Sequence, residues 1–243
     1  MPRLVAIHYS PWSEKARWAL DHHAINYREV AYLPMLGTPL LRLQMRRLTG
    51  KVTVPVLFID DQAIADSYEI ARYVDRVGMG TPLFPVDAAQ EVARWNALSE
   101  QACHAGRALA TTRTATDDEA LQEAVPSQIP WPLRGTMGKV GVRYLVNKYA
   151  LNETDENGHR QSAREVLQAL DQAVEGRDTV LDQFSFADIA MAAALQLLWP
   201  VSDDHIRLGR HTRRCFTDET LVAEFPNLGP WRDRLYANHR GRF

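Results

Sequence analysis

The stretch IHYSPWSEKARWAL, residues 7–20, decides the fold of this chain, because it joins a strand to a helix through one short turn. The apolar run LVAIHY that leads into the turn has the length of a β-strand. Beyond the turn, Ala16, Ala19 and Leu20 recur at the spacing of an amphipathic helix. The stretch therefore predicts the first strand and the first helix of an α/β domain.

The turn itself carries two serines, Ser10 and Ser13, on either side of Pro11 and Trp12. A serine at the start of a helix can cap the free backbone N–H groups with its side-chain oxygen. Its O–H can instead donate a hydrogen bond to an anion. The positive end of the helix dipole also attracts an anion. The residues alone leave both roles open for Ser10.

The remainder of the first eighty residues alternates between strand and helix signals. Strand-like runs are NYREVAYL, VPVLFID and QAIA, and helix-like runs are TPLLRLQMRRL and the segment from Ser67 to Val77. The pair Asp60-Asp61 separates two of the strands and is typical of a hairpin turn. The order βαβ followed by αββα predicts a mixed four-stranded sheet with helices on both faces.

The run GMGTPLFPVD is rich in glycine and proline and predicts a linker. We expect one domain over residues 1–79, a linker over residues 80–87 and a second domain over residues 88–243. No convincing strand follows the linker, so the second domain is predicted to be all-helical. Its first helix is expected to run from Asp87, as N-cap, to about Arg113, with Gln90 in the capping-box position.

Residues 114–138 contain Pro126, Pro130 and Pro132 and are predicted to be irregular. A loop of that length is uncommon in a compact domain unless it is functional or mobile. We therefore expect this segment to cover a cleft.

Composition excludes several classes of function. The 243 residues include 28 basic and 30 acidic side chains, which gives a net charge of −2. That balance argues against a nucleic-acid-binding protein. The longest apolar run, about eleven residues, is shorter than the roughly 20 that span a membrane. Since the first residues also lack the apolar core of a signal peptide, we expect a cytoplasmic protein without membrane contact.

Neither the cysteines nor the histidines form a recognisable site. Cys103 and Cys215 lie far apart and make no redox or metal motif, and the eight histidines show no metal-ligand spacing. We expect no metal cofactor.

Three local motifs together resemble the cytosolic glutathione S-transferases. They are the Ser10 to Ser13 turn, TGKVTVPVLF with Val54-Pro55 before a strand, and IADSYEIARYV with Asp66-Ser67 at a strand-to-helix junction. In the second half, FSFADIAMA resembles the helix-capping motif of that family, with Ser185 as cap and Asp188 at N3, and FPNLGPWRDRL resembles its last core helix. The resemblance covers nearly the whole chain and implies a thioredoxin-like domain followed by a helical bundle.

The resemblance implies that glutathione is a co-substrate and that Ser10 is the catalytic residue. A thiol has a pKa of about 8.5 and attacks as the thiolate. A hydroxyl at the start of a helix can stabilise that anion, so the turn needs no sulfur of its own. Tyr9 and Ser13 remain alternatives for this role, although Ser13 is more typical of a first-turn residue.

The glutathione-binding residues that the resemblance implies lie in the three motifs. Val54 is expected to pair with the peptide through its backbone, next to a cis bond to Pro55. Asp66 and Ser67 are expected to hold the γ-glutamyl end, although Asp66 with Glu69 also forms a capping-box pattern. The implied contacts are Trp12, Lys51, Thr53, Val54, Pro55, Asp66 and Ser67.

The second substrate implied by the resemblance is a small apolar electrophile held between the two domains. Candidate contacts are Trp12, Leu33, Met35, His104, Arg107 and Trp131. Conjugation, dehalogenation, peroxide reduction and isomerisation all begin with the thiolate, so the reaction stays open. The resemblance also implies a homodimer and a role in detoxification.

Two other classes of function compete with the transferase interpretation. A thiol-disulfide enzyme would need a cysteine at Ser10 or Ser13, and the sequence has none there. A non-catalytic protein that binds glutathione or another ligand on the same fold is the stronger alternative, because fold does not dictate function.

Overall fold

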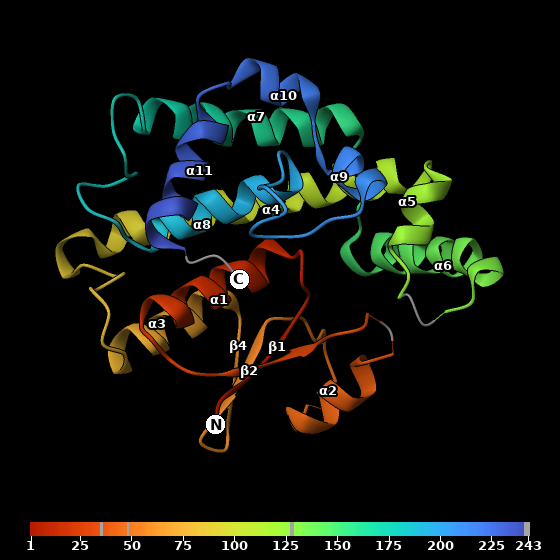
Figure 1. Cartoon of the computed structure of the whole chain (residues 1–243), viewed down its shortest axis with the longest axis horizontal. Coiled ribbons are helices and arrows are strands. Elements are labelled where there is room, and N and C mark those ends of the chain that lie inside the picture. The colour runs from red at the N-terminus through yellow and green to blue at the C-terminus, as the bar shows by residue number, and fades with distance from the viewer. Residues whose placement is uncertain (35, 48, 127–128, 241–243) are drawn as a thin grey trace.

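The computed structural model describes residues 1–34, 36–47, 49–126 and 129–240. Figure 1 shows a smaller α/β part, in red to orange, below a larger helical part. The sheet has the strand order β2-β1-β3-β4, with β1 parallel to β2 and antiparallel to β3, and β3 antiparallel to β4. The strands are β1 (Arg3–Ala6), β2 (Arg28–Ala31), β3 (Val56–Ile59) and β4 (Gln62–Ala65).

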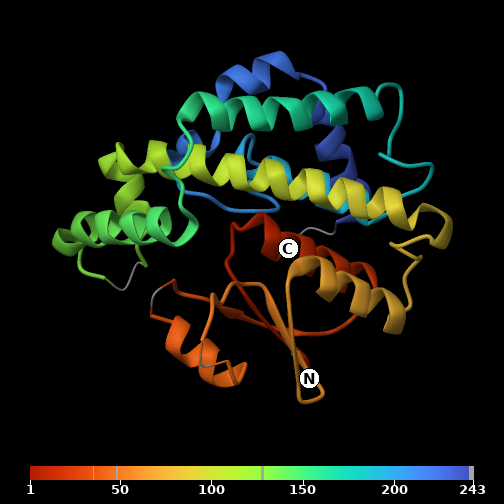
Figure 2. The same ribbon diagram turned by 180° about the vertical axis from the view of Figure 1, so that it is seen from behind.

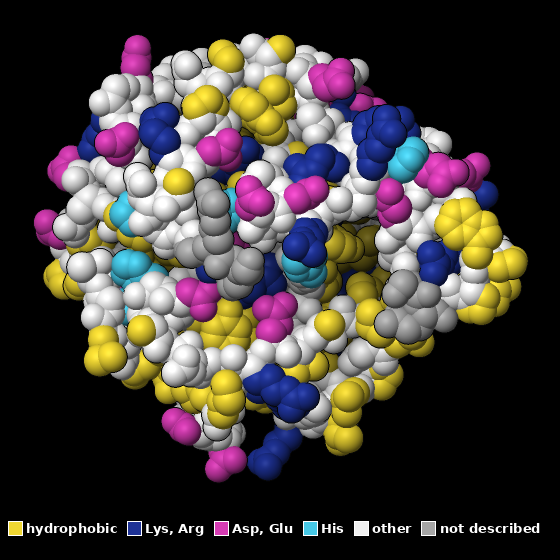
Figure 3. Space-filling model, in the orientation of Figure 1, with side chains coloured by type: hydrophobic (Ala, Val, Ile, Leu, Met, Phe, Trp, Pro, Cys, Tyr) yellow, Lys and Arg dark blue, Asp and Glu magenta, His cyan; other side chains and the backbone are white. Residues whose placement is uncertain are grey.

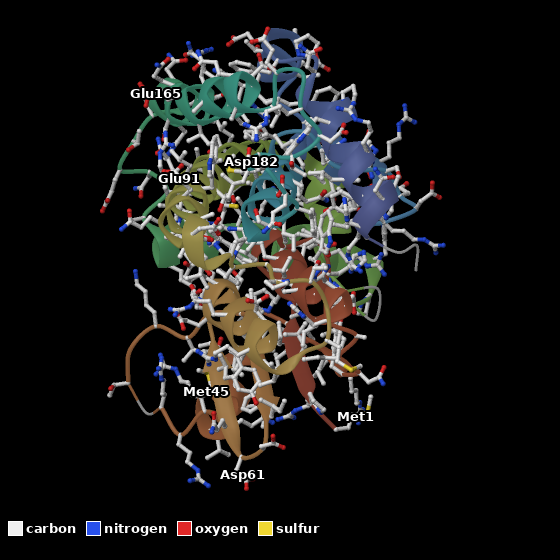
Figure 4. The ribbon with its side chains drawn as sticks, turned by 90° about the vertical axis from the view of Figure 1, so that its left-hand side faces the viewer. Met1, Met45, Asp61, Glu91, Glu165 and Asp182 are labelled. Atoms are coloured by element: carbon white, nitrogen blue, oxygen red, sulfur yellow. The ribbon has the colours of Figure 1, made fainter. Side chains whose placement is uncertain are left out.

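Three helices accompany the sheet: α1 (Pro11–His22), α2 (Thr38–Gln44) and α3 (Ser67–Val77). The order of elements is the predicted βαβ-αββα, which confirms the thioredoxin-like prediction. Figure 2 shows α1 and α3 between the sheet and the helical part. Asp60 and Asp61 have φ values of 45° and 63°, which a tight two-residue hairpin turn requires. Figure 4 places Asp61 at the tip of the α/β part, far from the helical part.

The remaining described elements are helical, which confirms the prediction of an all-helical second part. The helix α8 is buried over its whole length and packs against α4 and α1. The α-helices are α4 (Ala89–Ala115), α5 (Asp118–Glu123), α6 (Trp131–Tyr149), α7 (Glu156–Ala173), α8 (Phe186–Ala194), α9 (Arg210–Phe216), α10 (Glu219–Glu224) and α11 (Leu228–His239). Two short 3₁₀ helices cover Val86–Ala88 and Leu195–Leu197.

The predicted start of the long helix was wrong by a short distance. Asp87 lies inside the 3₁₀ turn Val86–Ala88 and does not cap α4, whose N-cap position is Ala88. The 3₁₀ turn begins directly after Pro85, so the chain is already coiled where the sequence pattern suggested a free cap.

The prediction that residues 114–138 are irregular was also wrong. The segment contains α5, capped by the Asp117 carboxylate, and the first turns of α6. Pro130 occupies the N-cap position of α6 and Pro132 lies in its first turn. Proline is tolerated there because the backbone N–H groups of a first turn have no helical partner. Prolines that suggested a loop therefore mark the start of a helix.

The predicted capping box of α8 is confirmed. Ser185 and Asp188 form the reciprocal pair, and both side chains are fully buried. The Asp188 carboxylate accepts hydrogen bonds from the Val180 N–H at 2.7 Å and the Ser185 N–H at 2.8 Å. One carboxylate thus fixes the start of the central buried helix and the loop before it.

A buried ion network ties α1 to the C-terminal end of the described chain. Glu14 accepts hydrogen bonds from Arg17 and Arg240, each at 2.9 Å, and the side chains of Glu14 and Arg240 are both 2% exposed. Arg240 also pairs with Asp21 at 2.6 Å. Burial alone would raise the pKa of Glu14, but the charges of Arg240 and Arg17 outweigh it and hold this pKa below its ordinary value.

This network predicts a pH dependence of stability. The pKa of Glu14 in the folded protein lies below its ordinary value of 4.5, so protonation below about pH 4.5 favours the unfolded chain. We expect the free energy of unfolding to fall as the pH falls below that value, and Glu14→Gln to weaken this acid dependence. Urea unfolding between pH 7 and pH 3.5 measures it. The exposed Glu119→Gln is the control, and an equal acid dependence in Glu14→Gln and wild type would contradict the assignment.

Candidate functional site

Ser10 lies at the start of α1 with an uncommitted hydroxyl. Its backbone is extended, its side chain is 9% exposed, and its carbonyl accepts a hydrogen bond from the Glu14 N–H at 2.9 Å. The side chain makes no capping hydrogen bond to the helix. Ser10 therefore occupies the N-cap position of α1, as the alternative reading expected, but its hydroxyl does not cap the helix and is available at the helix's positive end.

The two alternatives to Ser10 differ in their surroundings. The Ser13 hydroxyl is fully buried and accepts a hydrogen bond from the Ile7 N–H at 3.1 Å, which ties α1 to the end of the preceding strand. The Tyr9 ring packs edge-on against Phe216 at 5.6 Å between centroids. Burial raises the pKa of Tyr9, so its phenol stays protonated at neutral pH. Of the two serine hydroxyls of the turn, that of Ser13 is bonded and that of Ser10 has no partner among the described residues.

The bond between Val54 and Pro55 is cis, as the sequence predicted. The β1–β3 ladder ends at the pair Val5 and Val56, so the backbone of Val54 lies just beyond the last paired residue. An extended peptide can add to a sheet at such a position through main-chain hydrogen bonds. Lys51 and Thr53, which precede the cis bond, have exposed side chains.

Asp66 and Ser67 have different roles at the start of α3. The Asp66 carboxylate accepts hydrogen bonds from the Tyr68 N–H at 2.8 Å and the Glu69 N–H at 3.4 Å, so it is the helix cap. Glu69 lies near Arg72 at 3.8 Å. The Ser67 side chain is 1% exposed, and its hydroxyl has no hydrogen-bond partner in the described chain. A buried polar group without a partner is uncommon and requires an explanation, such as a ligand.

Trp12 is held by an acidic residue of α4 that sequence reasoning missed. Its indole N–H donates to the Glu100 carboxylate at 2.6 Å, and the fully buried Lys15 ammonium pairs with the same carboxylate at 2.8 Å. Lys15 also donates to the Ser99 hydroxyl at 2.7 Å. Burial alone would raise the pKa of Glu100, but Lys15 and Trp12 outweigh it and lower this pKa. These contacts fix the start of α1 against the helical part.

A second group of side chains from the helical part lies beside Trp12. The guanidinium of Arg107 lies over the rings of Trp12 and Tyr149, at 4.5 Å and 3.7 Å from their centroids. His104 contacts the edge of the Trp12 ring at 5.7 Å. The sequence suggested His104 and Arg107 as electrophile contacts, and the structure brings both to Trp12.

Lys148, at the end of α6, reaches the segment before the cis bond. Its ammonium donates to the Val52 carbonyl at 3.0 Å. The residue was missed because the start of its helix was read as a loop, and nothing local in the sequence links residue 148 to residue 52. The helical part thus supplies two cations to this region: Lys148 at Val52, two residues before Val54, and Arg107 at Trp12.

The other candidate contacts are less confined. Leu33 and Trp131 are 44% and 61% exposed, and Met35 lies outside the described residues. Figure 3 shows a hollow with hydrophobic walls in the region between the start of α1 and α6. Another hollow, lined by Arg3, Arg28 and Asp61 among others, lies at the far end of the sheet (Figure 4) and is not part of this site.

Comparison with known proteins identifies the family of this chain. The family model for the N-terminal domain of glutathione S-transferases matches residues 9–77, and the model for their C-terminal domain matches residues 108–234. The chain belongs to the glutathione S-transferase family. This member is 31% identical over 85 residues to a "Probable glutathione S-transferase" of Solanum tuberosum, a match that spans 35% of this chain and 38% of that relative.

Solved structures of other glutathione S-transferases share the fold. One, from Methylobacterium radiotolerans in complex with glutathione sulfonate, is 20% identical with a TM-score of 0.61, over 98% of this chain and 91% of that chain. Another, from Pseudomonas fluorescens with bound glutathione, is 20% identical with a TM-score of 0.62, over 97% of this chain and 94% of that chain.

Neither a metal centre nor a membrane-spanning helix is found among the described residues. Among residues 1–34, 36–47, 49–126 and 129–240, no group of three or more metal-ligating side chains could hold an ion. Within the same ranges, no helix has the length and hydropathy to cross a membrane.

Proposed function

We propose that this glutathione S-transferase family member is a serine-type transferase that binds glutathione, stabilises its thiolate with Ser10 and transfers it to an apolar electrophile. The observation that carries the proposal is the uncommitted Ser10 hydroxyl at the start of α1. No residue of the described part of the chain bonds this hydroxyl, and it lies where the helix dipole favours an anion.

The proposed mechanism follows from the chemistry of a thiol. Free glutathione ionises near pH 8.5, the reference value for a cysteine thiol. The Ser10 O–H donates a hydrogen bond to the sulfur and lowers this pKa, so the thiol proton passes to solvent near neutral pH. The thiolate then forms a bond to the electrophilic carbon, and the leaving group departs with the electrons of its own bond.

The proposed contacts hold the two ends of glutathione on either side of Ser10. The Val54 backbone pairs with the cysteinyl part beside Pro55, while Trp12 and Thr53 flank it. The Ser67 hydroxyl and N–H take the γ-glutamyl carboxylate, and Asp66 lies near the amine. Lys148 joins Lys51 as a candidate partner of the glycyl carboxylate, since its ammonium already lies 3.0 Å from the Val52 carbonyl.

Ser67→Ala tests the glutathione site. The variant removes a buried hydroxyl that the described chain leaves unpaired, so we expect little loss of stability but about tenfold weaker glutathione binding. Isothermal titration of glutathione measures the affinity. The exposed Ser202→Ala is the control and should bind as wild type does. Undetectable glutathione binding by the wild-type protein would remove the proposal altogether.

The remaining expectations are part of the same proposal. They are a homodimer, a cytoplasmic location, a role in detoxification and domain limits at residues 79 and 88. A non-catalytic glutathione-binding protein is the alternative, and it predicts that bound glutathione keeps its ordinary thiol pKa and that no electrophile of a broad panel is conjugated.

A further inference from the structure

Arg107 is half-buried and differs from the fully buried arginines of the described chain. Arg17 and Arg240 both pair with the Glu14 carboxylate, and Arg232 pairs with Asp233. Within the described chain, Arg107 has no ion pair with any carboxylate, and its buried Nε has no hydrogen-bond partner. Even partial burial of a guanidinium without a paired carboxylate is unfavourable, and desolvation lowers the pKa of Arg107, so the position requires another explanation.

The nearest acidic group does not serve Arg107. Glu100 lies two turns earlier on α4, but its carboxylate accepts from Lys15 at 2.8 Å and from Trp12 at 2.6 Å. Glu100 also attracts Arg107 electrostatically, but its direct bonds go to Lys15 and Trp12, and one carboxylate cannot balance both cations. The positive charge of Arg107, beside the Trp12 ring, therefore has no carboxylate of its own to balance it.

The side chains that hydrogen-bond the Arg107 head in the described chain are His104 and Tyr149, and neither is a carboxylate. The Arg107 Nη2 lies 2.6 Å from His104 Nδ1, and since a guanidinium has no acceptor, the histidine nitrogen must accept. Burial and the charge of Arg107 both lower the pKa of His104, which keeps the ring neutral at physiological pH. His104 orients the guanidinium without cancelling its charge.

The surroundings of the Arg107 guanidinium suit a flat anion. The Trp12 and Tyr149 rings both lie against the guanidinium and restrict its rotation. A guanidinium held in a fixed plane has the geometry that binds a carboxylate with two parallel hydrogen bonds. The flanking rings also offer apolar surface to the body of the same ligand.

We propose that the second substrate is an electrophile whose apolar body carries one carboxylate, and that Arg107 binds this carboxylate while glutathione lies at Ser10. The inference rests on the proposed function. Its basis is the juxtaposition of an unbalanced, oriented guanidinium with Trp12, two residues from Ser10. The proposed glutathione contacts come mainly from the α/β part, whereas Arg107 comes from α4 and so faces the other reactant.

A matched pair of substrates tests the proposal: 4-chloro-3,5-dinitrobenzoate and its neutral methyl ester. In each reaction the thiolate forms a sulfur–carbon bond, and chloride leaves with the electrons of the carbon–chlorine bond. We expect Arg107→Met to lower kcat/KM for the carboxylate roughly tenfold more than for the ester, because a charge-assisted bidentate contact is lost. Arg107→Lys should retain part of the preference, as a point charge without the planar fork.

Arg94→Met on the same helix is the control, because it removes the same charge from an exposed arginine that pairs with Glu91. It should leave both substrates unaffected. Equal losses for the carboxylate and the ester in Arg107→Met, or no loss, would overturn the proposal. Weaker glutathione binding in Arg107→Met would also overturn it, by assigning the guanidinium to glutathione.

A binding experiment separates this inference from the proposed function. Isothermal titration of unreactive 3,5-dinitrobenzoate and its methyl ester needs no turnover. Preference for the benzoate in wild type, lost in Arg107→Met, would support the anion site even if no electrophile were conjugated. Conjugation of other electrophiles together with no preference for the benzoate would leave the transferase and remove the anion site.

Discussion

The Ser10→Ala variant is expected to conjugate glutathione about 100-fold more slowly than the wild-type protein, measured as kcat/KM with an electrophile in excess. The expectation follows from the loss of one donor aimed at a developing anion, which typically reduces rates by about 10² to 10³. Since the Ser10 hydroxyl makes no capping bond to α1, its removal should change the stability of the protein little. The effect should therefore appear in the rate and in the thiol pKa, and not in the thermal midpoint.

Ser13→Ala is the matched control, because it removes a hydroxyl three residues away in the same turn. Its hydroxyl accepts from the Ile7 N–H and is fully buried, so this variant should lose stability and keep the thiol pKa of bound glutathione. A rate loss in Ser13→Ala that equals or exceeds that of Ser10→Ala, in protein that remains folded, would move the catalytic role to Ser13.

Asp188→Ala is expected to destabilise the protein by about 3 kcal/mol. It leaves the Val180 and Ser185 N–H groups buried without their acceptor, and each unsatisfied group costs about 1 to 3 kcal/mol. Removing a buried carboxylate offsets part of this, because burial raises the pKa of Asp188 to about 6. For a chain of this length, about 3 kcal/mol corresponds to a fall in Tm of about 6 to 12 °C.

The exposed Asp182→Ala provides the control, since its carboxylate only pairs with the exposed Arg177. It should stay within about 0.5 kcal/mol of wild type. Asp188→Ala with a wild-type Tm at pH 7.5 would show that the capping box does not support α8.

The pKa of Asp188 adds a second signature. Its folded value of about 6 lies above the ordinary 3.8, so folding favours the protonated carboxyl. The contribution of this group to stability is therefore present below about pH 4 and is lost as the pH rises through 6. Urea unfolding of Asp188→Asn should lack this dependence between pH 4 and pH 7.

The features that the sequence predicted correctly depend on neighbouring residues. The cis bond at Pro55, the hairpin turn at Asp60 and Asp61, and the capping box of Ser185 and Asp188 each lie within a few residues of chain. Local backbone chemistry decides such features, so the pattern of residue types was sufficient.

The features that sequence reasoning missed depend on tertiary contacts. Lys15 and Glu100 are 85 positions apart, and Lys148 and Val52 are 96 positions apart, so no periodicity connects them. Lys15 in particular has the sequence context of an ordinary helix residue, and only the packing of α1 against the helical part buries it. The prolines near α6 led to a wrong prediction of a loop, because proline occurs at helix starts as well as in loops.

The measurement that tests the central claim most directly is the ultraviolet difference spectrum of bound glutathione as a function of pH, in wild type and Ser10→Ala. We predict a thiolate band that titrates well below pH 8.5 in wild type and about one to two pKa units higher in the variant, the effect of one charge-assisted hydrogen bond. A low pKa that Ser10→Ala leaves unchanged, or bound glutathione that ionises near pH 8.5 in wild type, would contradict the assignment of Ser10.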